Sequence, residues 1–271
     1  METTELTRFL SDSDRDLGKA AVHLQDIAKK MDLSPEEIQE IFSQALHMMD
    51  WMVEYKELRM MYDCALHAIR TKFEVLDEEF NTRIQRNPID HIQTRLKSNQ
   101  SILMKMYRKG VPFNLENMEK TVHDIAGIRI ICSYEDDIYT LAEALLSQDD
   151  VQLISKKDYI ANPKESGYRS LHLIVSIPVY FSRVRREMTV EVQIRTIAMD
   201  FWASLEHHMK YKQAIPHEEN VIRRLRDCAD RAAELDREML EIRRQIDEAK
   251  DPEDPETMME ERLKLLDRGG F

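Results

Sequence analysis

Apolar residues in the first third of the chain follow a helical period. Ser34, Pro35 and Glu37 together form the capping signature of a helix start. Apolar side chains then recur at steps of three and four, first at Ile38, Phe42, Ala45, Met49 and Met52 and again at Tyr62, Leu66, Ile69, Phe73, Leu76 and Phe80. This pattern predicts a helical seam. Such a seam packs against the rest of the same protein or against another subunit, and the sequence leaves both uses open.

The middle of the chain mixes strand and helix periods. Asn87 and Pro88 end the first helical pattern. Stretches rich in Val, Ile and Thr with alternating apolar residues predict strands, and helical periods lie between them. The predicted strands are 127–133, 151–155, 168–179 and 187–195, and the predicted helices are 97–109, 137–147 and 197–212. Strands interleaved with helices indicate an α/β or α+β sheet domain.

The last part of the chain is highly charged. A single helix over 217–250 would carry one apolar stripe, formed by Val221, Leu225, Ala229, Ala232 and Leu235. The Asp-Pro-Glu-Asp-Pro-Glu run that starts at Asp251 predicts a solvated linker. We therefore predict four regions, which are a helical N-terminal region at 1–87, a sheet core at 88–213, a C-terminal helix at 214–250 and an acidic tail at 251–271.

Composition narrows the chemistry. The 271 residues carry 39 basic and 51 acidic side chains, a net charge of −12 that argues against coating nucleic acid or an anionic membrane by bulk charge. The six glycines form neither G-x-G-x-x-G nor G-x-x-x-x-G-K-[ST]. Any phosphate binding must therefore rely on side chains more than on a glycine-rich backbone loop.

The cysteines and the apolar runs bear on location. Cys64, Cys132 and Cys228 are far apart and odd in number, which argues against a disulfide framework and fits a reducing cytoplasm. The N-terminus is acidic and lacks the apolar stretch of a signal peptide. The longest apolar-leaning run, 171–181, is too short to span a bilayer. We expect a cytoplasmic protein with no membrane segment.

A basic cluster lies between residues 95 and 109. It consists of Arg95, Lys97, Ser101, Lys105, Arg108 and Lys109. On a helix, residues 97, 101, 105 and 108 would share one face. Such a face suits a polyphosphate, because ammonium groups, a hydroxyl and a guanidinium all donate to phosphate oxygens. The alternative is a solvated basic helix face.

Two carboxylates lie at predicted strands. Asp124 leads into strand 127–133, near the strand face that carries Arg129. In strand 187–195, apolar residues alternate with three polar ones that share the other face, Glu191, Gln193 and Arg195. Asp124 and Glu191 would together suit one Mg²⁺, which prefers few carboxylates plus phosphate oxygens and water. The alternative for the polar strand face is a sheet surface open to solvent.

A loop before residue 172 carries an aromatic residue among cationic ones. Pro163 and Gly167 predict the loop, which feeds a strand. Tyr168, with Lys, Arg and His side chains on either side, offers a stacking platform with phosphate donors beside it. Taken alone, an aromatic residue at the end of a loop serves packing more often than base stacking.

Three segments, HDIAGIRI, DYIANPKESGYRSLH and EVQIRTIAMDFWASLEH, occur in this order. The combination resembles the RelA/SpoT-type (p)ppGpp synthetase domain, and within that family the small, single-domain alarmone synthetases. The likeness covers about residues 50–250 and is nearly unbroken over 88–213. It implies an α+β, nucleotidyltransferase-like fold with a mixed five-stranded sheet, flanking helices and helical extensions at both ends. It also implies a GTP pyrophosphokinase, which transfers pyrophosphate from ATP to the 3′-hydroxyl of GDP or GTP and yields ppGpp or pppGpp plus AMP.

The resemblance implies a role for each motif residue. Arg95 and Arg129 would hold the adenine of ATP between their guanidinium groups. The ATP phosphates would bind Lys97, Ser101, Lys105 and Arg108. Asp124 would bind Mg²⁺, and Glu191, beside Gln193, would assist the metal or polarise the acceptor hydroxyl. The site for GDP or GTP would comprise Tyr168 stacked on the guanine together with Lys164, His172, Arg195 and Glu206.

Two departures limit what carries over from relatives. The stretch 88–95 lacks the P-I-E-F-V-T-G-R pattern of some tetrameric members, and Asp200 stands where those relatives carry asparagine. The resemblance implies a homo-oligomer, a tetramer in those members, but these departures leave the tetramer and control by the product open. The chain has no room for the separate hydrolase domain of the long relatives, so we expect synthesis without hydrolysis.

Two other functions stay open for the same fold. One is a toxin-like pyrophosphate transferase that acts on tRNA, against which the acidic charge argues. The other is a non-catalytic guanine-nucleotide-binding regulator, against which the presence of both Asp124 and Glu191 argues. We expect ATP and GDP or GTP as partners, and no nucleic acid.

Overall fold

The computed structural model describes residues 34–84, 86–210 and 218–249. The first 33 residues of the predicted N-terminal region and the predicted acidic tail at 251–271 lie outside this description. The chain divides into two compact units, with the boundary after Leu58. The predicted region boundaries at 87, 213 and 250 stay predictions.

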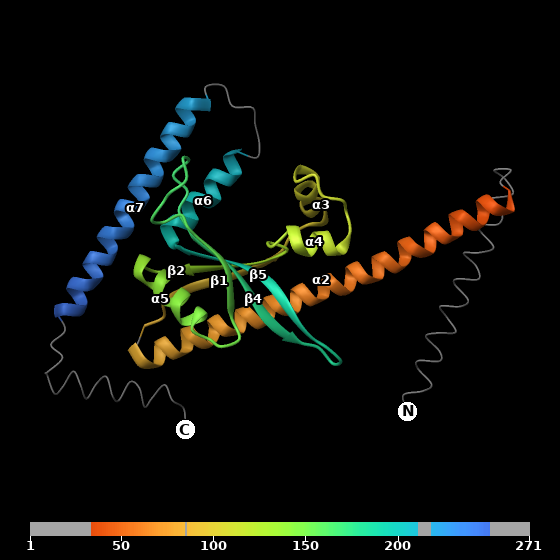
Figure 1. Cartoon of the computed structure of the whole chain (residues 1–271). Coiled ribbons are helices and arrows are strands. Elements are labelled where there is room, and N and C mark those ends of the chain that lie inside the picture. Colours follow the sequence, from red (N-terminus) through yellow and green to blue (C-terminus); the bar gives the residue numbers. More distant parts are fainter. Residues whose placement is uncertain (1–33, 85, 211–217, 250–271) are drawn as a thin grey trace. The chain divides into compact units, whose positions relative to one another are not determined.

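A mixed five-stranded sheet forms the centre of the second unit (Figure 1). Its strands are β1 (Ile89–Leu96), β2 (Ala126–Cys132), β3 (Gln152–Asp158), β4 (Leu171–Tyr180) and β5 (Arg185–Thr196), in the spatial order β1-β2-β5-β4-β3. Strands β2 and β5 are parallel, and the other neighbours are antiparallel. The α+β fold with a mixed five-stranded sheet is therefore confirmed.

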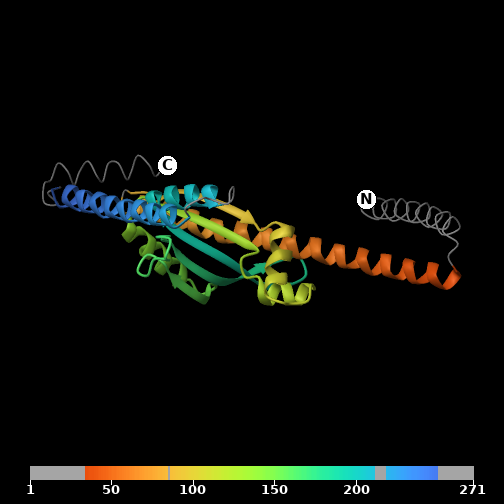
Figure 2. The same ribbon diagram turned by 90° about the horizontal axis from the view of Figure 1, so that it is seen from above.

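Helices precede, interrupt and follow the sheet in the chain. They are α2 (Pro35–Ile84), α3 (Asn99–Arg108), α4 (Leu115–Thr121), α5 (Glu135–Leu146), α6 (Ile197–Lys210) and α7 (Glu218–Ala249). Helices α6 and α7 lie side by side in both views (Figures 1 and 2). The helical regions predicted before and after the sheet core are present in the described residues.

The second half of α2 belongs to the core of its own chain. Tyr62, Leu66, Ile69 and Phe73 are at most 2% exposed. The helix is also tied to the segment after α5, where the Lys72 ammonium contacts Asp150 at 2.7 Å. For these residues the predicted seam therefore packs within the protein. Met49 and Met52, in the first half of the seam, are more than half exposed, and the side chains of Ile38 and Phe42 lie outside the description.

Strand β5 shows how the sequence pattern builds the sheet. Val190, Val192 and Ile194 are fully buried, as their alternation predicts. Burying each such side chain stabilises the fold by about 1.5–3 kcal/mol. The residues between them, Glu191 and Gln193, stay partly accessible on the opposite face. The apolar face thus fixes the register that presents the polar one.

Two predictions along the chain need correction. Residues 97–109 do not form one helix, because Ser98 is the N-cap of α3 and its hydroxyl oxygen accepts the Ser101 N–H. Lys97 lies before the helix and continues the strand pairing, since its N–H donates to the Ile125 carbonyl at 2.8 Å. Strand β1 and helix α4 are also absent from the elements that the hydrophobic pattern predicts.

Candidate active site

Three adjacent strands line a cavity of about 350 Å³. Its walls come from β1, β2 and β5, and its lining residues are Gln93, Thr94, Arg95, Gly127, Ile128, Arg129, Glu191 and Gln193. The register explains the meeting, because Gly127 pairs with Arg95 on one side and with Glu191 on the other. Arg95 and Arg129, which are predicted to hold adenine, therefore share a cavity with two of the three predicted catalytic residues, Glu191 and Gln193.

The Asp124 carboxylate accepts hydrogen bonds from two ammonium groups. Lys97 Nζ and Lys105 Nζ each lie 2.8 Å from one of its carboxylate oxygens. Burial would raise the pKa of Asp124, but the hydrogen bonds and charges of Lys105 and Lys97 outweigh burial and lower it. The carboxylate is therefore ionised at neutral pH. The two lysines thus meet at Asp124, but Lys97 reaches it from the residue before the Ser98 N-cap and not from the predicted helical face.

The other two predicted phosphate ligands on α3 lie at opposite ends of that helix. Ser101 is in the first turn, where its hydroxyl oxygen accepts the Ser98 O–H at 2.8 Å. Arg108 is the last residue, and its Nε donates to the Met104 carbonyl. The helix rises by seven residue steps from Ser101 to Arg108, which places their backbones about 10 Å apart along its axis.

Glu191 is the second ionised carboxylate. Its Oε2 accepts a hydrogen bond from Gln193 Nε2 at 2.9 Å, and its Oε1 lies 3.6 Å from His172 Nδ1. Burial would raise the pKa of Glu191, but the hydrogen bond and charge of His172 outweigh burial and lower it, while the charge of Asp124 opposes them. The charge of Asp124 therefore acts on the Glu191 carboxylate.

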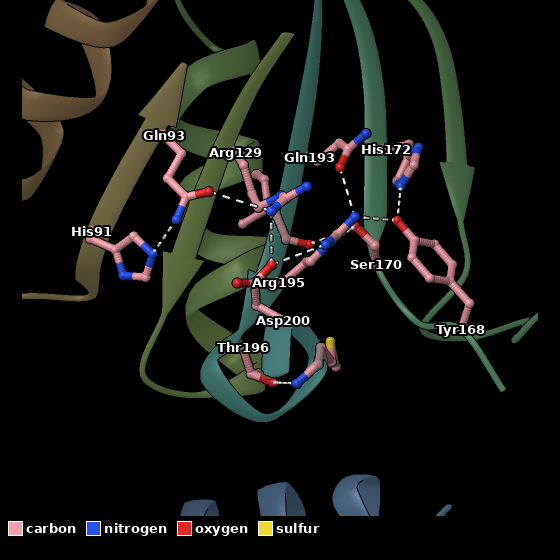
Figure 3. A network of polar contacts seen from close by, with 12 residues as sticks. His91, Gln93, Arg129, Tyr168, Ser170, His172, Gln193, Arg195, Thr196 and Asp200 are labelled. Carbon is pink, nitrogen blue, oxygen red and sulfur yellow. Dashed lines mark hydrogen bonds and ion pairs between the residues drawn. The ribbon is translucent and has the colours of Figure 1, made fainter. Parts of the chain in front are cut away.

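Arg195 is the centre of a buried polar network (Figure 3). The residue is 4% exposed. One terminal nitrogen, Nη2, donates to the Tyr168 hydroxyl at 2.5 Å and to Gln193 Oε1 at 2.7 Å, while Nη1 donates to Asp200 Oδ1 at 3.0 Å. The Tyr168 hydroxyl also contacts His172 Nε2 at 2.8 Å, which closes a ring of contacts back to Glu191. Arg195, itself predicted to bind the guanine nucleotide, is thus buried and contacts the predicted site residues Tyr168 and Gln193.

The predicted guanine platform is covered by a cation. Lys164 Nζ lies 4.7 Å from the centre of the Tyr168 ring and 4.5 Å from that of Tyr159, and the Arg195 guanidinium lies 5.1 Å from the Tyr168 ring. Lys164 is itself exposed. A base that stacked on the lysine side of Tyr168 would displace this flexible ammonium.

Asp200 is a site residue whose contacts the sequence did not predict. It lies in the first turn of α6, and its Oδ1 is 3.2 Å from Arg129 Nη1 as well as 3.0 Å from Arg195 Nη1. Burial and the charge of Arg195 lower the pKa of Arg129, which Asp200 partly offsets. The signal in the sequence was its place one turn after the polar strand that ends in Arg195. Glu206 lies half-buried nearly two turns further along α6.

Within the part of the chain that the structure describes, no three His, Cys, Asp or Glu side chains gather as a ready metal site. None of the helices in that part is both long enough and apolar enough to cross a membrane.

A mixed sheet with cationic side chains beside two carboxylates is typical of a protein that binds phosphorylated nucleotides. Comparison with known proteins identifies the family. Residues 94–216 match the family described as the region found in RelA / SpoT proteins. The chain is 42% identical over 196 residues to the GTP pyrophosphokinase YwaC of Bacillus subtilis, an alignment that covers 72% of this chain and 93% of that protein.

Solved structures agree with the sequence comparison. The crystal structure of small alarmone synthetase 2 from Bacillus subtilis superposes with a TM-score of 0.64 at 42% identity and covers 71% of this chain and 99% of that one. Small alarmone synthetase 1 from the same organism, bound to its product pppGpp, gives a TM-score of 0.65 at 38% identity over 72% of this chain and 98% of that one. The chain belongs to the RelA/SpoT family, among its small alarmone synthetases.

Proposed function

We propose that this protein is a GTP pyrophosphokinase, which moves the pyrophosphate of ATP to the 3′-hydroxyl of GDP or GTP and releases AMP. The observation that carries the proposal is a pair of ionised carboxylates beside cationic side chains. Glu191 lines one cavity with Arg95 and Arg129, and Asp124, whose charge acts on Glu191, contacts Lys97 and Lys105. The relatives named GTP pyrophosphokinase support the same reaction.

On the donor side, cationic groups come from the cavity wall and from the segment that starts at Lys97 and continues into α3. Arg95 and Arg129 both line the cavity, and their guanidinium planes suit stacking on adenine. Lys97 and Lys105, now on Asp124, are flexible ammonium groups that suit the phosphates, with Ser101 and Arg108 as further donors along α3. Neutralising the negative charge of the transferred group is the main electrostatic task of such a transfer.

On the acceptor side, Tyr168 would stack on guanine while Lys164 and His172 bind phosphate or ribose oxygens. Glu191 is held ionised beside this group and would accept the proton of the attacking hydroxyl or polarise it. Gln193 keeps the Glu191 carboxylate in place through its hydrogen bond, and Arg195 fixes both Gln193 and Tyr168. These hydrogen bonds would help to hold the two nucleotides in line for the transfer.

The donor set fits Mg²⁺. Asp124 and Glu191 offer ionised oxygen ligands, and this hard ion typically binds to one or two carboxylates together with substrate phosphates. When bound, the ion would neutralise charge on the phosphate oxygens.

A product assay tests the proposal. The protein is mixed with MgCl₂, ATP labelled in the β-phosphate and either GDP, GTP or tRNA, and the nucleotides are separated. We expect labelled ppGpp or pppGpp and one AMP for each product formed. Absence of both products would refute the proposal, and label on tRNA would identify the alternative acceptor.

We also propose that the protein forms a homo-oligomer and works in the cytoplasm. The support for self-association is a set of exposed apolar side chains in the first half of α2, which are Ile41, Leu46, Met48, Met49, Met52 and Val53. The support for a reducing compartment is that Cys64, Cys132 and Cys228 are all free thiols.

A further inference from the structure

The loop that carries Lys164 and Tyr168 rests directly on α7. Gly167 has a φ of +89°, and its N–H donates to the Lys164 carbonyl at 2.8 Å, which makes the turn tight. A Cβ atom at Gly167 would lie 2.5 Å from the Ala229 side chain, so only glycine lets the loop approach the helix this closely. The conformation of the loop is therefore defined by α7.

Arg169 fastens this contact. Its Nη1 donates to the Gly167 carbonyl at 3.2 Å and to the Ala229 carbonyl at 3.3 Å, and its Nη2 donates to Asp230 Oδ1 at 3.0 Å. The guanidinium thus bridges the loop backbone, the α7 backbone and an α7 carboxylate. Its side chain is 17% exposed, so these hydrogen bonds are partly shielded from water.

Tyr168 is packed on the same helices. It lies against a small cluster of Trp202 and Ala203 from α6 and Ala229 from α7. The Trp202 Nε1 donates to the Leu225 carbonyl at 2.8 Å, which joins α6 to α7. A change in the distance between loop and α7 would therefore move the ring of Tyr168.

We propose that Arg169 is a positioning residue for the guanine nucleotide, which acts by holding the 164–168 loop against α7 so that Tyr168 keeps its stacking orientation. The inference rests on the proposed function, since it assigns the loop to the acceptor nucleotide. It also assigns to α7, which lies beyond the matched family region at 94–216, a part in acceptor binding and none in ATP binding.

Binding measurements on single variants separate this role from a structural one. GDP and a non-hydrolysable ATP analogue are titrated separately into the wild type and into Arg169→Gln, Arg169→Lys and Asp230→Asn. For Arg169→Gln we expect the Kd for GDP to rise about tenfold while the Kd for the ATP analogue stays within about twofold. Arg169→Lys should fall between it and the wild type, because one ammonium keeps only part of the fork.

Controls distinguish the possible failures. Arg231→Gln removes an exposed arginine of α7 and should change neither the Kd for GDP nor the Kd for the ATP analogue. If Arg169→Gln does not fold, Asp230→Asn carries the test, and an unchanged GDP Kd in that variant overturns the inference. An equal rise in the Kd for GDP and in the Kd for the ATP analogue, in a folded variant, also overturns the inference. A wild type that binds neither nucleotide would instead overturn the proposed function, and the inference with it.

Discussion

At the scale of single residues, each of the two site carboxylates is balanced by neighbouring donors. The Asp124 carboxylate is shared between Lys97 and Lys105, and the Glu191 carboxylate between Gln193 and His172. On the proposed function, a polyphosphate would compete with Asp124 for the two ammonium groups. Asp124 would then be released to a cation that comes with the phosphates.

Glu191→Gln should abolish most of the transfer without unfolding the protein. The amide has the shape of the carboxylate but neither its charge nor its basicity, so we expect kcat to fall by about 10²–10⁴. Release of AMP in the presence of ATP and GTP measures kcat, and circular dichroism checks the melting temperature. Glu187→Gln is the matched control, since Glu187 lies on the same strand and pairs with Arg185 at the surface. Near-normal kcat in Glu191→Gln would remove Glu191 from the reacting atoms.

Lys105→Gln should weaken ATP binding and raise the pKa of Asp124. The charge and hydrogen bond of Lys105 are named causes of the lowered pKa, so their loss lets burial act more strongly. We expect KM for ATP to rise about tenfold, with a smaller change in KM for GTP. Steady-state kinetics at varied ATP measures this. Lys120→Gln, which removes an exposed lysine on α4, is the control, and equal KM values for both variants would contradict the assignment.

At the scale of elements, the sequence predicted the central strands better than the edge strands. Strand β5 has an uninterrupted apolar alternation because one of its faces is fully buried. Strand β1 buries Ile89 and leaves most other side chains accessible, because an edge strand has one neighbour and needs little apolar surface. For the same reason the hydrophobic pattern did not show it. The contacts of Asp200 were equally hidden, since they depend on where α6 starts relative to β2 and β5.

The contact between β5 and α7 contains a carboxyl group that destabilises the fold when ionised. Thr196 Oγ1 donates to Asp236 Oδ2 at 2.6 Å. Burial, with a smaller contribution from the charge of Glu135, raises the pKa of Asp236 from 3.8 to about 6. The Thr196 hydrogen bond and the charge of Arg169 lower the pKa and offset part of this rise. Between about pH 4 and pH 6 the folded state therefore binds more protons than the unfolded state, and stability falls as the pH rises through this window.

Asp236→Asn should consequently stabilise the protein at neutral pH. An amide still accepts the Thr196 hydrogen bond and carries no buried charge. We expect a gain of about 1–2 kcal/mol at pH 7.5, allowing for partial solvation, and a gain near zero at pH 4. Thermal melts of wild type and variant across this range measure the difference. The exposed Asp227→Asn on the same helix serves as control, and a gain that did not depend on pH would contradict the titration of Asp236.

At the scale of the whole molecule, α2 divides its apolar residues between two uses. The seam residues from Tyr62 to Leu76 are buried within the chain, which answers the question that the sequence left open for that half of the seam. Six apolar side chains between Ile41 and Val53 are exposed, on a chain with a net charge of −12. Apolar side chains repeated along a helix are the usual interface of helical assemblies. The first half of α2 is therefore where we expect subunits to meet.

Replacing Met49 and Met52 by lysine should dissociate the assembly. Lysine favours helix nearly as well as methionine, so α2 should persist, whereas two charges on the apolar stripe oppose its burial against another subunit. Light scattering should give the wild type a multiple of 32.1 kDa and the double variant a smaller mass. Gln44→Lys adds a charge at an exposed polar position of the same helix and should leave the mass unchanged. A wild type of monomer mass would refute self-association, whereas a double variant of undiminished mass would place the interface elsewhere on the chain.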